Sequence, residues 1–174
     1  VHITVKERTE QAEDHSFYAG KNGKLIAVEL SPPPSANDQK LLEAAHLLSA
    51  MHVDTVTFPD SPSGRTRADS ILMAAKVARE TDLCVMPHIC CRDKNAIAIR
   101  SQLLGAYLSD IRNALVITGD PVPSMAREDV RSVFNFDSVG LMKLVQEMNR
   151  EEFASDPFFV GGAINQNRLR LDVE

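Results

Sequence analysis

The sequence lacks the features that mark several common classes of protein. Only three of its 174 residues are cysteines, too few for the disulfide framework of a small secreted domain, so we expect a reducing, cytoplasmic setting. No apolar run approaches the roughly 20 residues of a membrane-spanning helix, and the start of the chain lacks the basic and then apolar layout of a signal peptide. The formal charge of −5 argues against nucleic-acid and membrane partners, which need clustered Lys and Arg.

Two nucleotide-binding motifs are also missing from the sequence. No GxGxxG follows the first apolar run, so a Rossmann dinucleotide site has no support, and no GxxxxGK[ST] occurs. The chain begins with Val1 rather than Met, from which we expect it to be a piece of a longer chain. Its size suits one domain. We interpret residues 1–23 as a leader or linker and residues 24–174 as that domain.

The sequence does contain an alternation of short apolar runs with segments of helical spacing. The five runs, rich in β-branched residues, are 24–30, 53–58, 83–88, 113–119 and 158–163. The helical segments between them are 36–51, 66–80, 94–109 and 137–150, and a fifth helix is predicted to open at 168–174. Nearly unbroken apolar runs are typical of parallel strands covered by helices. The pattern therefore predicts an α/β fold, either a (β/α)8 barrel or a doubly wound sheet.

Each helical segment shows apolar residues that we expect to line its inward side. In the first three segments these are Leu41, Leu42, Ala45, Leu48 and Ala50 or Met51, then Ile71, Leu72, Ala75 and Ala78, then Ile97, Ile99, Leu103, Leu104 and Leu108. Ser35 or Asn37 is the predicted N-cap of the first helix, because Ser and Asn side chains accept hydrogen bonds from the free amides of a first turn.

Polar residues gather at the carboxyl ends of the predicted strands. Glu29 ends the first strand, Thr57 the second and His88 the third, while "TGD" (118–120) closes the fourth and Asn165 follows the fifth. The strand amino ends carry nothing comparable. In both candidate folds the carboxyl edge is where ligands bind. The pattern therefore predicts a site at this edge.

Each of these residues also has a purely structural interpretation. Glu29 could pair with an arginine such as Arg65 or Arg67, although two arginines near a helix start also suit an anionic ligand. Thr57 is a common strand residue, and His88 could be a core histidine bonded to a carbonyl. "GDP" at 119–121 is a good turn sequence.

A pair of adjacent cysteines raises a different possibility. "PHICC" places Cys90 and Cys91 next to His88 at the ligand edge, and zinc favours such ligands. However, adjacent cysteines point in different directions, and Cys84 lies at the opposite end of the strand. We favour small apolar residues packed beneath the loop, with a zinc-thiolate methyltransferase as an alternative.

Five blocks of the sequence resemble successive blocks of the methylenetetrahydrofolate reductase family. They are "VELSPP" at 28–33, "TVTFPDSPSGRTRADS" at 55–70, "MPHICCRDKN" at 86–95, "LVITGDPVP" at 115–123 and "FVGGAINQN" at 159–167. The resemblance is strongest to the reductase half of bifunctional proteins that also carry a homocysteine S-methyltransferase domain. It implies a (β/α)8 barrel that binds FAD and passes hydride from NAD(P)H to the flavin. From there hydride goes to 5,10-methylenetetrahydrofolate, which gives 5-methyltetrahydrofolate.

The resemblance also gives Glu29 a role. The bridging methylene of the folate accepts hydride only after a ring nitrogen is protonated and the ring opens to an iminium. Glu29 matches the general acid for that step, and burial at the barrel mouth is expected to favour its neutral form. The three prolines that follow end the strand and fix the loop. Asp120 matches an aspartate near the flavin pyrimidine edge that also contacts the folate.

The remaining matched positions are implied to line the cofactor. They are Thr57, Phe58, His88, Thr118, Gly119, Asn135, Ala163 and Asn167. Three depart from forms found in the family, since Thr118 stands where an arginine occurs, Ala163 where a tyrosine occurs and Asn167 where a histidine occurs. These departures bear on the FAD contacts. No metal ligand is implied.

Only about the first five βα units of such a barrel are present. A complete barrel has eight strands in about 250 residues, so we expect this chain to lack reductase turnover by itself. Its open strand edges predict a homo-oligomer. A non-catalytic barrel fragment that acts as a binding or association module is the other alternative.

Overall fold

The computed structural model, which describes residues 24–124 and 129–163, is built on one parallel sheet. Its strands are β1 (Ala27–Glu29), β2 (Thr55–Phe58), β3 (Cys84–Cys90), β4 (Asn113–Ile117) and β5 (Phe159–Gly162). They lie in the order β1-β2-β3-β4-β5, and every neighbouring pair is parallel. All five predicted strands are confirmed, and β3 extends two residues beyond its predicted end.

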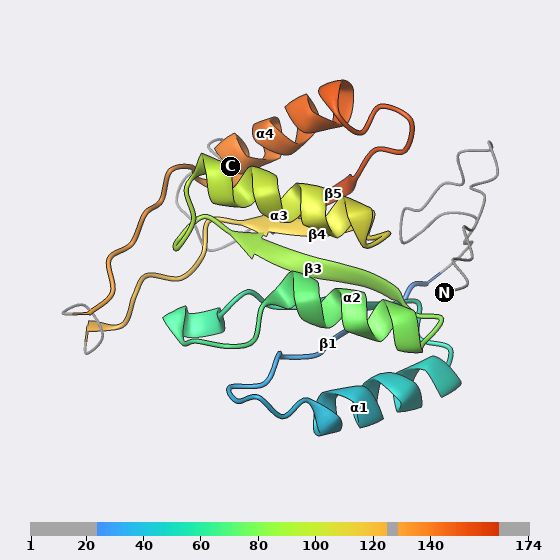
Figure 1. Ribbon diagram of the computed structural model, residues 1–174. Coiled ribbons are helices and arrows are strands. Elements are labelled where there is room, and N and C mark those ends of the chain that lie inside the picture. Colours follow the sequence, from blue (N-terminus) through green and yellow to red (C-terminus); the bar gives the residue numbers. More distant parts are fainter. Residues whose placement is uncertain (1–23, 125–128, 164–174) are drawn as a thin grey trace, which may run out of the picture.

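Four helices connect these strands and cover a single face of the sheet (Figure 1). They are α1 (Gln39–Ala50), α2 (Ser70–Glu80), α3 (Ala96–Leu108) and α4 (Ser138–Glu151). A doubly wound sheet would reverse its strand order and carry helices on both faces. The sequential order with helices on one side is that of consecutive units of a (β/α)8 barrel. The predicted fifth helix and the predicted leader lie outside the described residues.

The helices begin where the sequence supplies capping side chains. Asp69, Asn95 and Asp137 accept hydrogen bonds from first-turn amides of α2, α3 and α4, which satisfies donors that have no partner within the helix. Helix α1 differs, because its N-cap is Asp38, whose side chain makes no capping hydrogen bond, so the predicted cap at Ser35 or Asn37 is wrong. Asn37, one residue earlier, accepts from the amide of Gln39 at 3.0 Å. No described helix is both long and apolar enough to traverse a bilayer.

The hydrophobic core lies between the helices and one face of the sheet. Strand side chains alternate between faces, and the helix-facing set includes Val56, Phe58, Val85, Ile89 and Val116, all buried. The predicted inward faces are only partly right. Leu72 is 66 % exposed, and three apolar residues of α3 are also exposed, namely Ile97, Leu104 and Leu108.

The amino edge of the sheet is not free of polar groups, contrary to the sequence interpretation. Arg112, just before β4, is 3 % exposed at its side chain and donates to Asp156 at 2.6 Å and to the carbonyl of Tyr107 at 2.8 Å. Its guanidinium also stacks over the Tyr107 ring. Every contact here is internal, so this cluster fastens β4 to the chain that precedes β5.

Candidate active site

The second face of the sheet, which no described helix covers, carries three polar side chains near the strand carboxyl ends. Glu29 of β1 pairs in register with Thr57 of β2, and Thr57 pairs with Met86 of β3. His88 follows Met86 by two residues and therefore points to the same side. The register thus brings the predicted Glu29, Thr57 and His88 to one surface, which would be the interior in a closed barrel.

None of these three side chains forms a hydrogen bond or ion pair within the described residues. Thr57 and His88 are half-buried and Glu29 is exposed. The expected burial of Glu29 is therefore wrong for the described chain, because β1 has a neighbour on one side only. Three polar side chains without partners among the described residues thus gather on one surface, unlike the paired side chains around Arg112.

The backbone carbonyl of His88 accepts a hydrogen bond, although its ring has no partner within the described residues. Ser70, the first residue of α2, is buried and donates its hydroxyl to the His88 carbonyl at 2.8 Å. Burial lowers the pKa of the His88 imidazole, while the negative charges of Glu29 and Asp60 oppose that shift. These charge effects place both carboxylates near the imidazole.

Replacing Glu29 with glutamine is therefore expected to lower the pKa of His88 further, because the substitution removes a charge that favours imidazolium. An NMR titration of the His88 ring measures this directly, with Glu43→Gln on the exposed surface of α1 as the control. An unchanged or higher pKa in Glu29→Gln would contradict the arrangement.

Because burial lowers the pKa of His88 in the folded state, protonation at pH below about 6.5 favours the unfolded chain. The stability contributed by neutral His88 is therefore lost as the pH falls.

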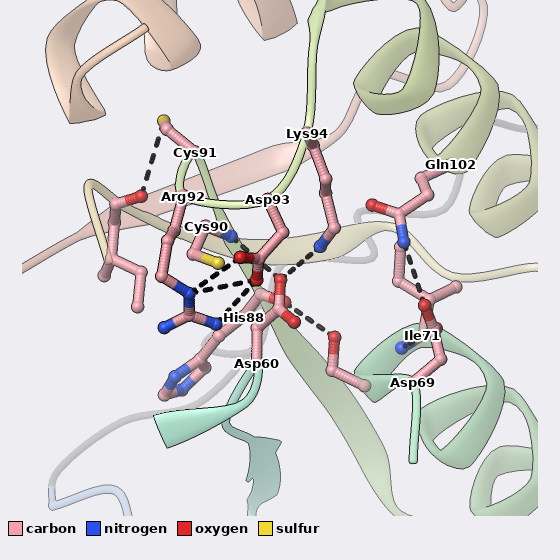
Figure 2. A network of polar contacts seen from close by, with 12 residues as sticks. Asp60, Asp69, Ile71, His88, Cys90, Cys91, Arg92, Asp93, Lys94 and Gln102 are labelled. Atoms are coloured by element: carbon pink, nitrogen blue, oxygen red, sulfur yellow. Dashed lines mark hydrogen bonds and ion pairs between the residues drawn. The ribbon is translucent and has the colours of Figure 1, made fainter. Parts of the chain in front are cut away.

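A buried ion pair lies next to His88 and was missed at the sequence level. Asp60, just after β2, accepts a short contact from the Lys94 ammonium and a 3.0 Å hydrogen bond from the Cys90 amide. Figure 2 shows both side chains pointing toward each other beside the end of β3. The side chains of Asp60 and Lys94 are 9 % and 14 % exposed. The pair ties the loop after β2 to the loop after β3.

A buried arginine connects the loop after β3 to the loop after β4. The side chain of Arg92 is 2 % exposed and pairs with Asp93 at 2.7 Å (Figure 2). It also donates to the backbone carbonyl of Asp120 at 3.2 Å. Gly119, the residue before Asp120, has φ +95°, and a Cβ there would lie 3.0 Å from the Cβ of Cys90. Only glycine allows this approach without strain.

A methylenetetrahydrofolate reductase family model matches residues 15–162, which is most of the chain and includes all five strands. The chain belongs to the methylenetetrahydrofolate reductase family. This confirms the resemblance at the level of the family, which comprises oxidoreductases of folate one-carbon metabolism. The family match begins inside the segment that we interpreted as a leader or linker.

Two solved structures show a weak likeness to the chain. They are the carboxyl transferase domain of Rhizobium etli pyruvate carboxylase with 3-bromopyruvate and the same domain with oxamate and biotin. Each is 15 % identical with a TM-score of 0.41, and the match covers 80 % of this chain and 27 % of that chain. The reductase-family chain thus spans about a quarter of their length, and the likeness carries no argument about function.

The predicted loop residues of the reductase-family site are occupied by internal contacts. The Thr118 hydroxyl accepts from the amide of Ser138 at 3.0 Å, at the start of α4. The Asn135 side chain accepts from the first amide of α3 at 3.2 Å. The exposed Asp120 accepts from the amide of Ser63 at 2.6 Å through Oδ2. Among the described residues its Oδ1 has no partner, so one oxygen stays available to a ligand.

Two further predicted positions lie apart from this surface. Phe58 is fully buried among the core residues on the helix-facing side, which leaves only its backbone to face a ligand. Ala163 is exposed after β5 and borders a 410 Å³ pocket beside α4, on the helix side. Asn167 and Asn165 lie outside the described residues.

The described residues give no support to the zinc site considered as an alternative. The Cys91 sulfur lies 3.4 Å from the Asp137 carbonyl and 3.6 Å from the Ile117 carbonyl. Burial raises the pKa of Cys90 to about 11 and that of Cys91 to about 12, so both are thiols near neutral pH in this structure. Within the described residues no cluster of three His, Cys, Asp or Glu is arranged around a metal position.

Proposed function

We propose that this chain forms the amino-terminal part of an FAD-dependent reductase that converts 5,10-methylenetetrahydrofolate to 5-methyltetrahydrofolate, with NAD(P)H as hydride donor. The observation that carries the proposal is the sheet face that no described helix covers, where Glu29, Thr57 and His88 lie together without partners among residues 24–124 and 129–163. Membership of the reductase family supplies the chemistry that such a face would serve.

Glu29 is the proton donor in this proposal. Its exposed carboxyl has no partner among the described residues, so it is free to contact a ring nitrogen of the folate. Proton transfer there opens the ring and makes the methylene carbon electrophilic. The buried Pro32, near the start of the loop after β1, limits the motion of this loop. Asp120 would contact the folate through Oδ1.

The described residues fit a flavin in two respects. The Thr57 hydroxyl and the His88 imidazole offer hydrogen bonds on a sheet face that no helix of the described chain covers. The hydrogen bonds of Asp60 and Arg92 hold the surrounding loops. When bound, FAD supplies the hydride chemistry. Thr57, His88 and the backbone at Gly119 would hold it.

Flavin binding to the intact protein tests the proposal. We expect Thr57→Val to weaken FAD binding about three- to tenfold, because one hydrogen bond contributes about 1 kcal/mol. Thr66→Val, in the exposed loop before α2, is the matched control and is expected to bind as the wild type. The measurement is a flavin titration followed by absorbance. An intact protein that takes up no flavin, or a Thr57→Val variant that binds normally, would refute the proposal.

Three parts of the sequence interpretation remain predictions. The 174 residues alone are expected to show no NAD(P)H-dependent turnover, since the later strands of a barrel would complete the site. The fused homocysteine S-methyltransferase domain, also still a prediction, is tested by the length of the intact gene product. A cytoplasmic location is a third prediction of the same kind.

A further inference from the structure

Helix α3 is apolar on its outward side as well as on its inward side. Ile99 and Leu103 are completely buried, whereas Ile97, Leu104 and Leu108 are 78 %, 42 % and 82 % exposed. A helix that is apolar all round is typical of one covered on both sides. Within the described residues, the sheet and neighbouring helices cover only its inner side.

The outward residues form a continuous line along the helix. Spacings of seven and eleven residues place Ile97, Leu104 and Leu108 along one side, with Ser101 and Gly105 between them. A Cβ at Gly105 would meet no atom within 4 Å. We call these five residues the α3 stripe. None of them is charged.

We propose that the α3 stripe is the centre of a twofold-symmetric interface with a second copy of this chain. When two copies of α3 lie antiparallel about an axis through the middle of the helix, Ile97 comes opposite Leu108 of the second copy. The same axis brings Ser101 opposite Leu104 of the second copy. Large residues then meet at both ends and a small residue meets a large one at the centre, so the surface is complementary to itself.

The charges around the α3 stripe permit this self-association. Arg100 is the only charged residue of α3, and its guanidinium is paired with Glu147 of α4 at 2.8 Å. In the antiparallel arrangement Arg100 comes opposite Gly105 of the second copy, so no like charges meet. An unrelated partner would need its own apolar surface, whereas a second copy supplies the matching one by symmetry.

The neighbouring helix widens the surface. The Gln102 side chain donates to Asp69 at 2.9 Å, which holds α3 against the start of α2. Leu72, in the first turn of α2, is exposed as well. The 13 residues of α3 span only about 20 Å, and a stable interface buries about 800 Å² on each partner. We therefore expect both helices to contribute and the dimer to dissociate on dilution.

Complementary charge variants test the proposed pairing by sedimentation velocity over a range of concentrations. The chain carrying Ile97→Lys and Leu108→Lys, and the chain carrying Ile97→Glu and Leu108→Glu, are each expected to associate at least about tenfold more weakly than wild type, because like charges meet across the axis. Mixed together, they are expected to form a heterodimer, since each lysine then faces a glutamate. Leu47→Lys, at an exposed position of α1, is the control and keeps the wild-type dimer.

Circular dichroism verifies that each variant is folded, which we expect because the substituted side chains are exposed. A wild-type chain that stays monomeric at every concentration would overturn the proposal. So would a dimer that persists in both charge variants, because association would then use another surface such as a sheet edge. Failure of the two variants to associate on mixing would exclude the antiparallel register. None of these outcomes depends on flavin or on reductase activity.

Discussion

Replacing Glu29 with glutamine in the intact protein is expected, on the proposed function, to slow reduction of methylenetetrahydrofolate by about a hundred- to ten-thousandfold, the usual contribution of a positioned general acid. Glutamine keeps the size of the side chain but has no proton to give to the folate nitrogen. Reduction of the flavin by NAD(P)H needs no such proton donor. We therefore expect that half-reaction to stay within about a factor of three of wild type, since the substitution leaves the flavin contacts in place.

Stopped-flow absorbance separates the two half-reactions by following the flavin first with NAD(P)H and then with folate. Glu43→Gln is the control, because Glu43 lies on the exposed side of α1, where it accepts from Gln39 at 2.9 Å. Equal slowing of both half-reactions would show that Glu29 serves the fold or the flavin and not proton transfer. Unchanged folate reduction would remove Glu29 from the mechanism altogether.

Replacing Asp60 with asparagine is expected to destabilise the fold by about 3–5 kcal/mol, the usual cost of leaving one partner of a buried ion pair without its counter-charge. The Lys94 ammonium would remain where its side chain is only 14 % exposed. Adding Lys94→Met to Asp60→Asn removes the stranded charge. The double variant is therefore expected to be more stable than the single variant.

Denaturant unfolding of the wild type, both single variants and the double variant measures the coupling between the two residues. The matched control is Asp38→Asn, which breaks a surface pair with Lys76 in which both side chains are more exposed. Its unfolding midpoint is expected to stay close to that of wild type. If Asp60→Asn unfolds like Asp38→Asn, the Asp60–Lys94 contact does not hold the two loops together.

The sequence predicts the elements well because local patterns decide them. Each β-branched run became a strand, and Asp69, Asn95 and Asp137 begin three helices by capping their first turns. Local sequence patterns could not distinguish a barrel from a doubly wound sheet. The two folds differ in strand order and in which faces of the sheet the helices cover, and only the structure shows both features.

Helical periodicity did not predict which side of α3 faces the core, because that helix has no polar side. In α3 nearly every position is apolar, so the spacing of Ile97, Leu104 and Leu108 matched an inward face as well as Ile99 and Leu103 did. Only packing against the sheet distinguishes the two sets. Propensity and pattern carry no information about such a choice.

The sequence predicted the part of the site that lies at the ends of strands. Glu29, Thr57 and His88 were found because polar residues at the ends of apolar runs stand out. The partnership of Asp60 with Lys94 was not found, because the two residues are 34 positions apart and each looks like an ordinary loop residue. The internal contacts of Thr118 and Asn135 likewise join elements that no local pattern connects.

The strand order has a consequence for how this protein is made. Every strand pairs with the one synthesised just before it, so a nascent chain can dock each βα unit onto its predecessor as it leaves the ribosome, without waiting for distant segments. Growth of the sheet from β1 outward keeps one freshly made edge exposed at each stage. Slow translation of the following segment would therefore prolong the time during which that edge can pair with another nascent chain.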